Sequence, residues 1–280
     1  MTPCQKYQYR VIARNLQGNS VPCEPTSVIT TLASENGPRK RRWIEDETGK
    51  RKRGKDGFAP SDYDRCFHDL WSKGRPAPAD FRIGSVYDYY DIFEEIGSGA
   101  FGVVHRAVEK STGKSFAAKF IVTPSAAEKA TVRKECDVMN QLIHPRLLNL
   151  HDVFDEGDEM VLVTEFLSGG ELFEKIADPN YTMSEPEAKR YIRQICQGLQ
   201  HMHENNIVHL DIKPENIMFE SRNSPNVKLV DFGLATRLDP DEVVKISSAT
   251  VEFAAPEIVE KDSVGFSTDM WAVGVLTYVM

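Results

Sequence analysis

Residues 207–216 read Ile-Val-His-Leu-Asp-Ile-Lys-Pro-Glu-Asn, and residues 231–233 read Asp-Phe-Gly; these two stretches decide the fold. Between them, two short β-prone runs at 217–219 and 227–230 surround a polar turn, which predicts a small pair of strands. Either motif alone is a weak signal. Asp-Phe-Gly occurs by chance in many proteins, and His209 is more often a core residue than a catalyst, so only a structural role is expected for it.

A long helix is predicted directly before this region. Residues 184–187, Ser-Glu-Pro-Glu, have the spacing of a capping box, which satisfies backbone groups at the start of a helix. Apolar residues then recur at helical spacing, and the helix is expected to end near Asn205 and Asn206. The residues expected on one face of this helix are Ala188, Ile192, Ile195, Leu199 and Met202.

A glycine-rich loop occupies residues 96–104, Ile-Gly-Ser-Gly-Ala-Phe-Gly-Val-Val. Its pattern G-x-G-x-x-G is weak evidence alone, because dinucleotide-binding units share it, and there the glycines open a helix. Here residues 103–109 favour a strand, and a turn at 111–114 leads to a second strand at 115–122. The loop therefore joins antiparallel strands, and its glycines let backbone N–H groups approach phosphates.

A lysine stands among apolar neighbours in the second strand, where residues 116–121 read Phe-Ala-Ala-Lys-Phe-Ile. A lysine is rarely buried without a partner, and Ala117 shares one face of the strand with Lys119. A small residue beside the base and an ammonium over the phosphates would suit a nucleotide cleft. The alternative is an edge lysine that faces solvent.

A partner for Lys119 is available on the helix predicted after Pro124 and Ser125. Glu135 borders the apolar stripe of that helix and can reach the lysine from its flank. Glu128 is the weaker choice, because it lies in the first turn, where the helix dipole already explains a carboxylate. The stripe consists of Val132, Cys136, Met139 and Ile143.

These features, in this order, resemble the protein kinase signature set. Residues 255–257, Ala-Pro-Glu, and 267–271, Ser-Thr-Asp-Met-Trp, extend the resemblance towards the end of the chain. It implies an α+β, bilobal protein kinase fold with a β-rich N-lobe and a helical C-lobe that is truncated. It also implies transfer of the ATP γ-phosphate to Ser or Thr of protein substrates.

The resemblance assigns catalytic roles to four residues. Asp211 accepts the proton of the substrate hydroxyl or orients that hydroxyl. Lys213 steadies the γ-phosphate, and a lysine at this position marks the serine/threonine branch. Lys119, paired with Glu135, lies over the α- and β-phosphates. Phosphoryl transfer asks the protein mostly for positioning and charge compensation, which explains why so few residues define it.

The resemblance also implies ATP and Mg²⁺ as cofactors. Asn216 and Asp231 would hold the magnesium ion, whose preferred ligands are hard carboxylate and amide oxygens. The full set of nucleotide-binding positions that it implies is Ile96, Gly97, Ser98, Gly99, Ala100, Phe101, Gly102, Val103, Val104, Ala117, Lys119, Glu165, Leu167, Glu171, Asn216 and Asp231.

Residues 161–167, Val-Leu-Val-Thr-Glu-Phe-Leu, would join the two lobes in this family. The backbone of residues 165–167 is then expected to bind adenine, with Thr164 at the back of the pocket. Glu171 and Glu215 would give the peptide groove negative charge. Substrates with a basic residue upstream of the target Ser or Thr are therefore expected, with a modest preference.

One departure from the family pattern is Leu210, which stands where many kinases carry an arginine that binds a phosphorylated activation loop. Leucine cannot bind phosphate, and the activation segment is already acidic over residues 239–242. Activity is therefore predicted not to require phosphorylation of Ser247 or Ser248. Thr250 is set apart, because in the family it contacts the catalytic aspartate and lysine directly.

The wider pattern resembles the giant muscle kinases of the twitchin, titin and myosin light chain kinase group. The resemblance implies a place on sarcomeric thick filaments, in the A-band, and muscle protein substrates such as myosin light chain. It also implies that a tail after the kinase domain holds the kinase inactive, and that mechanical strain or a calcium-sensor protein releases it. One alternative is a structural or mechanosensing scaffold with a kinase-like domain, and another is a nuclear kinase. The resemblance rests on residues 90–97, 166–173, 209–218 and 253–257.

Three regions are expected along the chain. Residues 1–32 resemble the last strands of a fibronectin type III domain, with Tyr7 as its corner tyrosine; the alternative is any amphipathic hairpin. Residues 33–80 are interpreted as a basic linker. Residues 81–280 form the kinase domain, incomplete at its C-terminus, since the chain stops within a helix expected to start near Asp269. The apolar faces of that helix are expected to be exposed, in an excerpt of a longer protein.

Composition is compatible with this interpretation. With 41% hydrophobic and 27% charged residues the chain resembles ordinary soluble proteins, and a net charge of −8 argues against nucleic acid as a partner. The five cysteines are scattered, which indicates reduced thiols in the cytoplasm. No apolar run approaches the ~18 residues of a membrane span, so no membrane partner is expected.

Overall fold

The computed structural model describes residues 81–82, 84–99, 102–239, 243–246 and 250–280, together with the backbone of four short strands nearer the N-terminus. The chain divides into two compact units, residues 1–59 and 60–280. The first unit contains two antiparallel pairs: β1 (Arg14–Asn15) with β2 (Gly18–Asn19), and β3 (Ile44–Glu45) with β4 (Arg51–Lys52). Tyr7 and the other strands predicted in the fibronectin-like segment lie outside the described residues.

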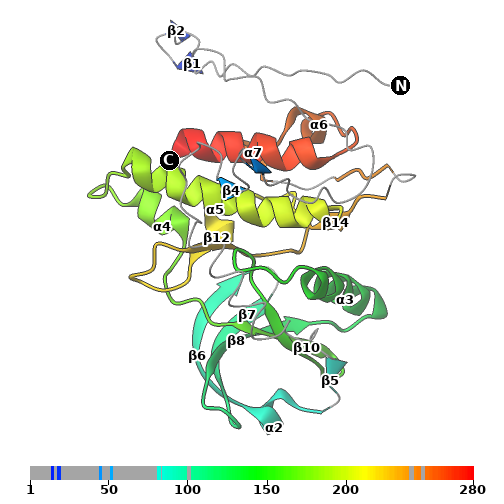
Figure 1. Cartoon of the computed structure of the whole chain (residues 1–280). Helices are drawn as coiled ribbons and strands as arrows, with labels where there is room; N and C mark the ends of the chain where they lie inside the picture. The colour runs from blue at the N-terminus through cyan, green and yellow to red at the C-terminus, as the bar shows by residue number, and fades with distance from the viewer. Residues whose placement is uncertain are drawn as a thin grey trace. The chain divides into compact units, whose positions relative to one another are not determined.

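The second unit contains a six-stranded sheet in the order β5-β9-β10-β8-β7-β6 (Figure 1). All neighbouring strands are antiparallel except β5 and β9, which are parallel. The predicted strand at 115–122 is confirmed with the same bounds, and the strand predicted at 103–109 begins one residue earlier. The strands are β5 (Phe81–Arg82), β6 (Tyr90–Gly99), β7 (Gly102–Glu109), β8 (Ser115–Val122), β9 (Leu150–Asp155) and β10 (Glu159–Glu165), and the one-turn helix α2 (Val86–Tyr89) precedes β6.

Helix α3 (Ala126–Gln141) lies beside this sheet (Figure 1). Ser125 caps it, because the hydroxyl accepts the N–H of Glu128 while the Glu128 carboxylate accepts the N–H of Ser125. Val132 and Cys136 of the predicted apolar stripe pack on β8, β9 and β10, whereas Met139 is buried in the core that Leu142 and Leu147 share. The prediction that Ile143 belongs to this stripe is wrong, because the helix ends at Gln141. The residue directly after the helix, Leu142, is the buried one.

Among the described residues, four helices follow the sheet in the sequence, and α5 and α7 lie alongside each other (Figure 1). Helix α5 begins at Glu185 within the predicted capping box, where the Glu187 carboxylate accepts from the hydroxyl and N–H of Ser184. Its buried face is rotated from the prediction, because Tyr191 and Gln194 are buried, whereas Ala188 and Ile192 are only half-buried. The four helices are α4 (Leu172–Ala177), α5 (Glu185–Glu204), α6 (Pro256–Val259) and α7 (Phe266–Val279).

Helix α7 begins at Phe266, three residues before the predicted Asp269. The Thr268 hydroxyl accepts the N–H of Gly265, the residue that precedes the helix. As expected, large apolar side chains of α7 are exposed, among them Met270, Trp271 and Tyr278. Among the described residues, no helix has the length and apolar character that crossing a bilayer requires.

Two small antiparallel pairs lie between α5 and α7 in the sequence. The predicted strand pair is confirmed, although its second strand ends at Leu229 and not at residue 230. Its side chains join the core formed by α5 and α7, in which Leu199, Ile217 and Leu229 are almost completely buried. The pairs are β11 (Ile207–Val208) with β14 (Thr236–Arg237) and β12 (Ile217–Phe219) with β13 (Val227–Leu229), and the 3₁₀ turns are η1 (Pro214–Asn216) and η2 (Val251–Phe253).

Candidate active site

The carboxylate of Asp211 is the centre of a polar cluster. Its Oδ2 accepts from Nζ of Lys213 over 2.8 Å and from Nδ2 of Asn216 over 2.7 Å, and its Oδ1 accepts from the Thr250 hydroxyl over 2.9 Å. Lys213 also donates to Thr250 over 3.1 Å. The contacts of Thr250 with the aspartate and the lysine are those that the family resemblance predicted. A single carboxylate is thus held from three sides.

Asn216 directly precedes β12, and Asp231 lies two residues beyond the end of β13. The backbone N–H of Val230 donates to the carbonyl of Asn216 over 3.0 Å, which joins the two segments. Asn216 uses Nδ2 to donate to the carboxylate and carbonyl of Asp211, so its amide oxygen is the atom that can face a cation. Asp231 adopts a left-handed backbone with φ 62°, and its Oδ1 accepts the N–H of Gly233.

His209 is fully buried and lies next to the polar cluster around Asp211. Its Nδ1 accepts the backbone N–H of Asp211 over 3.4 Å, and its ring lies 5.5 Å from that of Phe232. Burial lowers the pKa of the His209 imidazole, against the raising effect of Asp269, Asp211 and Asp231. A neutral, buried ring supports the backbone here, which is the structural role expected for it.

Asp269 of α7 anchors the stretch directly before Asp211, and the sequence analysis did not predict this role. Its carboxylate accepts the backbone N–H groups of His209 and Leu210 over 2.9 and 2.8 Å, and Nε2 of His203 lies 2.7 Å from it. Leu210 has φ 68°, a left-handed conformation that a non-glycine residue rarely adopts. The buried carboxylate therefore holds a strained turn directly before Asp211. The signal for this role was an acidic residue in the first turn of a helix, which the dipole explains equally well.

Lys119 and Glu135 meet as predicted. Nζ of Lys119 lies 3.9 Å from Oε1 of Glu135, and both side chains are mostly buried. Lys119 stands opposite Val104 on β7 and Leu162 on β10, in the interior of the sheet and not at its edge. Burial raises the pKa of the Glu135 carboxyl, Lys119 lowers it, and the charge of Asp231 raises it again. Glu135 thus lies within electrostatic reach of the Asp-Phe-Gly segment.

The glycine-rich loop joins β6 and β7 as an antiparallel turn, with Gly99 opposite Gly102. Gly102 must be glycine, because it has φ 131° and a Cβ there would collide with the carbonyl of Phe120. Ile96, Gly97, Ser98, Val103 and Val104 lie on the two strands beside the turn. Ala100 and Phe101 lie outside the described residues.

The segment that joins the lobes begins at the end of β10. Thr164 is 9% exposed and stands opposite Ala117 on β8, so these two residues line the same part of the sheet. Leu167 follows the strand and is half-buried. Among the described residues, no backbone hydrogen bond is made by the N–H of Leu167.

Glu171 caps α4, where its backbone N–H donates to the Glu174 carboxylate. Burial raises the pKa of the Glu171 carboxyl, and the charges of Glu174 and Glu215 raise it further. The two glutamates that were expected to share one groove are therefore close enough to interact electrostatically.

A family model described as the protein kinase domain matches residues 90–280. The chain belongs to the protein kinase family. Its bilobal kinase fold is therefore confirmed, with a sheet in the N-lobe and helices in the C-lobe. The protein kinase region is also similar to that of individual muscle proteins, which confirms the resemblance found in the sequence.

Three relatives define this likeness. A protein named "Titin homolog" of Caenorhabditis elegans is 42% identical over 287 residues, covering 100% of this chain and 2% of that protein. Smooth muscle myosin light chain kinase of Gallus gallus is 38% identical over 282 residues, covering 99% of this chain and 14% of the relative. The solved twitchin kinase region of C. elegans is 53% identical with a TM-score of 0.71, covering 98% of this chain and 47% of that one. This kinase chain thus spans less than half the length of each.

Proposed function

We propose that this protein transfers the γ-phosphate of ATP to serine or threonine residues of other proteins. The observation that carries the proposal is the carboxylate of Asp211, held by Lys213, Asn216 and Thr250 beside the strand that leads to Asp231. Phosphoryl transfer needs an oriented hydroxyl and compensation of phosphate charge. This cluster offers a hydrogen-bond acceptor for the hydroxyl and an adjacent ammonium for the phosphate.

In this proposal Asp211 accepts the proton of the substrate hydroxyl while the hydroxyl oxygen forms its bond to the γ-phosphorus and ADP departs. Lys213 lies 2.8 Å from Asp211, so its ammonium is placed to neutralise the transferring phosphoryl group. Lys119, oriented by Glu135, neutralises the α- and β-phosphates from the opposite lobe. The catalytic set is therefore Asp211, Lys213, Lys119 and Glu135.

The adenine end of the nucleotide is assigned to the backbone of residues 165–167. The N–H of Leu167 makes no hydrogen bond to another described backbone group, so it can serve a ligand. Ala117 and Thr164 face each other across β8 and β10 and would lie beside the base. The turn between β6 and β7 would cover the phosphates with its backbone N–H groups.

Asn216 and Asp231 fit a magnesium ion by their chemistry, because one amide oxygen and one carboxylate are hard donors. Magnesium held by these two residues would offset the negative charge of the phosphates. Among the residues that the structure describes, no group of three or more His, Cys, Asp or Glu side chains could hold a metal. Such a lean protein shell is typical of Mg²⁺ bound together with nucleotide phosphates and water.

The protein substrates are proposed to carry a basic residue upstream of the target Ser or Thr. Glu171 and Glu215 support this, because the charge of Glu215 is near enough to raise the pKa of the Glu171 carboxyl. The names of the relatives further support a muscle kinase in the cytoplasm, on sarcomeric thick filaments, with substrates such as myosin light chain. A calcium-sensor protein that acts on a tail after the kinase domain is part of the same proposal.

The scaffold alternative is not favoured, since the kinase relatives and the intact cluster around Asp211 both support an enzyme. The domain order proposed for the chain is the end of a fibronectin type III domain at 1–32, a basic linker at 33–80 and the kinase domain at 81–280. The division of the chain near residue 59 and the family match from residue 90 are compatible with it.

The test is transfer of ³²P from Mg·ATP to a serine peptide with an upstream arginine, catalysed by the full chain. Asp211→Asn is expected to lower kcat by about 100-fold or more while the affinity for Mg·ATP is retained. Asp137→Asn, an exposed change of the same type on α3, should have no effect. A peptide with glutamate in place of arginine should be the poorer substrate.

Transfer that Asp211→Asn leaves unchanged would remove this residue from the proposed role. Failure of the wild-type chain to bind Mg·ATP would contradict the proposal that the protein is an enzyme. Only a mechanical or docking role would then remain.

A further inference from the structure

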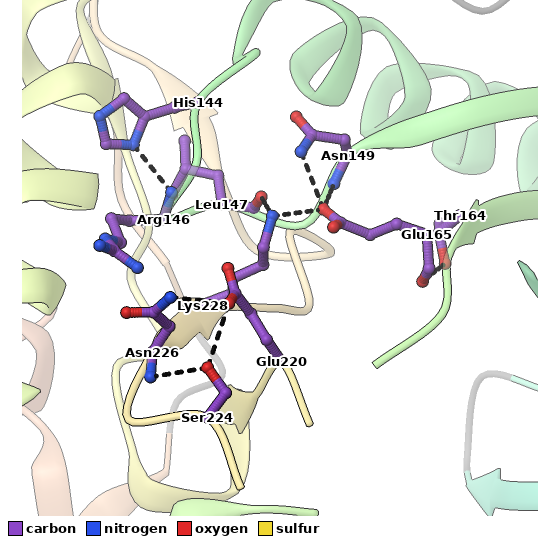
Figure 2. A network of polar contacts seen from close by, with 10 residues as sticks. All are labelled: His144, Arg146, Leu147, Asn149, Thr164, Glu165, Glu220, Ser224, Asn226 and Lys228. Carbon is purple, nitrogen blue, oxygen red and sulfur yellow. Dashed lines mark hydrogen bonds and ion pairs between the residues drawn. The ribbon is translucent and has the colours of Figure 1, made fainter. Parts of the chain in front are cut away.

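Lys228 is a buried lysine that the proposed chemistry does not use. It lies on β13, is 6% exposed, and places Nζ 2.7 Å from Oε1 of Glu165 in the segment that joins the lobes (Figure 2). The same Nζ lies 3.5 Å from the carbonyl of Leu147. A buried ammonium is tolerated only with such partners. The pair therefore ties two segments that lie 63 positions apart in the sequence.

Asn149 completes this contact from a third segment (Figure 2). Its backbone N–H and its side-chain amide both donate to Oε1 of Glu165 over 2.8 Å, and the N–H of Glu165 returns a hydrogen bond to the carbonyl of Asn149. Residues 146–148 are in turn bonded to β13, through the N–H of Leu229 and its carbonyl. Glu165 is thus fixed on both its side chain and its backbone.

The next residues of the joining segment are anchored independently. The N–H groups of Ser168 and Gly169 donate to the carbonyls of Glu220 and Phe219, and the N–H of Phe219 donates to the carbonyl of Gly170. Gly169 allows this close approach, since a Cβ there would collide with Phe219. Residues 166–167 therefore span two anchor points on the β12–β13 pair, of which Glu165 is the upstream one.

We propose that Lys228 is a positioning residue that sets the preference of the site for adenine over guanine nucleotides. The inference rests on the proposed function, in which the backbone of residues 165–167 binds the base. Adenine and guanine present opposite donor and acceptor patterns at the edge that such a backbone contacts. Selection between them requires peptide groups that cannot turn to satisfy the wrong pattern. The contacts that hold Glu165 prevent the peptide groups of residues 165–167 from turning in this way.

The alternative is that the Lys228–Glu165 ion pair only stabilises the fold. Gln194 provides a matched control for such a purely structural effect. Gln194 is a buried polar residue on α5 that supports the same strand pair from the other side. Its amide donates to the carbonyl of Pro225 and accepts the N–H of Val227, the neighbour of Lys228. It makes no hydrogen bond to the described joining segment. Gln194→Leu should therefore loosen β13 without releasing Glu165.

The experiment measures binding of Mg·ATP and Mg·GTP to the full chain by isothermal titration calorimetry. Lys228→Met is expected to weaken Mg·ATP binding about tenfold, the scale of one lost charge-assisted hydrogen bond, and to leave Mg·GTP binding unchanged or stronger. The ratio of the two affinities then falls about tenfold. Lys228→Arg should restore most of the ratio, and Gln194→Leu should keep the wild-type ratio even where it lowers the melting temperature.

An unchanged ratio in Lys228→Met, or an equal loss in Gln194→Leu, would overturn the inference while leaving the proposed function intact. Glu165→Gln removes the same charge pair from its other side, so it decides the question if Lys228→Met does not fold. A wild-type chain that binds neither nucleotide would overturn the proposed function, and this inference with it.

Discussion

The hydroxyl of Thr250 donates a hydrogen bond to Oδ1 of Asp211 over 2.9 Å, across 39 positions of sequence. The same hydroxyl accepts from Lys213 over 3.1 Å. One side chain at the end of the activation segment thus touches both the residue proposed to orient the substrate hydroxyl and the residue proposed to bind the γ-phosphate. The position of the activation segment is thereby coupled directly to the geometry of Asp211 and Lys213.

Thr250→Ala is expected to lower kcat by about 10- to 100-fold, because small displacements of catalytic groups cost factors of this size. The affinity for Mg·ATP should not change, since Thr250 contacts neither Lys119 nor the joining segment. Steady-state kinetics with a serine peptide, combined with calorimetric nucleotide binding, measures both quantities.

Thr250→Ser is the matched control, because it keeps the hydroxyl and should retain most of the wild-type kcat. Equal losses in the alanine and serine variants would show that the methyl group, and not the hydrogen bond to Asp211, carries the effect.

The activation segment is held by apolar packing around Leu210, which is 5% exposed and packs with Val208 and Val264. Val244 and Ile246 of the activation segment pack against this cluster. No phosphate is needed for these contacts. The prediction that activity is independent of activation-segment phosphorylation therefore has a structural basis, although Ser247 and Ser248 themselves lie outside the described residues.

Ser247→Ala and Ser248→Ala, made singly, are expected to leave kcat and both KM values as in the wild type. Kinetics of phosphatase-treated protein and mass spectrometry of the same samples give the measurement. A phosphate at either serine that raised the rate about tenfold, the effect typical of a loop ordered by phosphorylation, is the result that would refute the prediction.

Glu187 provides a test of stability against pH. Hydrogen bonds from Tyr181 and Ser184, with the charge of Lys175, lower the pKa of its carboxyl from 4.5 to about 2. Because the folded pKa is the lower one, the carboxylate stabilises the fold above pH 4.5, and this contribution disappears as the pH falls towards 2. Glu187→Gln should cost about 1 kcal/mol at pH 7, a figure reduced for the partial exposure of the group.

Urea unfolding of the wild type and of Glu187→Gln at pH 7 and pH 3 measures this difference. The gap between the two proteins should narrow on acidification. A gap that stayed constant would mean that the helix cap, and not the carboxylate charge, is what the variant loses.

Much of the fold and of the site could be predicted, because the signals are local. The strand at 115–122 follows from a β-prone run after a turn, and α3 follows from apolar residues at helical spacing. The Lys119–Glu135 pair follows from the need of a lysine among apolar residues for an acidic partner. Lys228 also stands in an apolar strand, but its partner Glu165 lies 63 positions away, where no local pattern indicates it.

Other features were decided by packing. Helix α5 presents Tyr191 and Gln194 to the interior because the β12–β13 pair lies there, and Gln194 binds its backbone. Periodicity alone cannot specify which of several neighbouring faces will be covered. Asp269 carried no signal beyond its place in a helix start, and its role depends on backbone groups at His209 and Leu210 that only the folded chain brings to it.

The order and chemistry of the motifs, the antiparallel glycine loop and the family follow from the amino-acid sequence alone, since each depends on residue types at short spacing. The tertiary structure alone decided that Asp269 holds the turn before Asp211 and that Lys228 holds Glu165. Both are contacts between residues about 60 positions apart. Such contacts form only when packing of the whole domain repays the entropy of closing long loops.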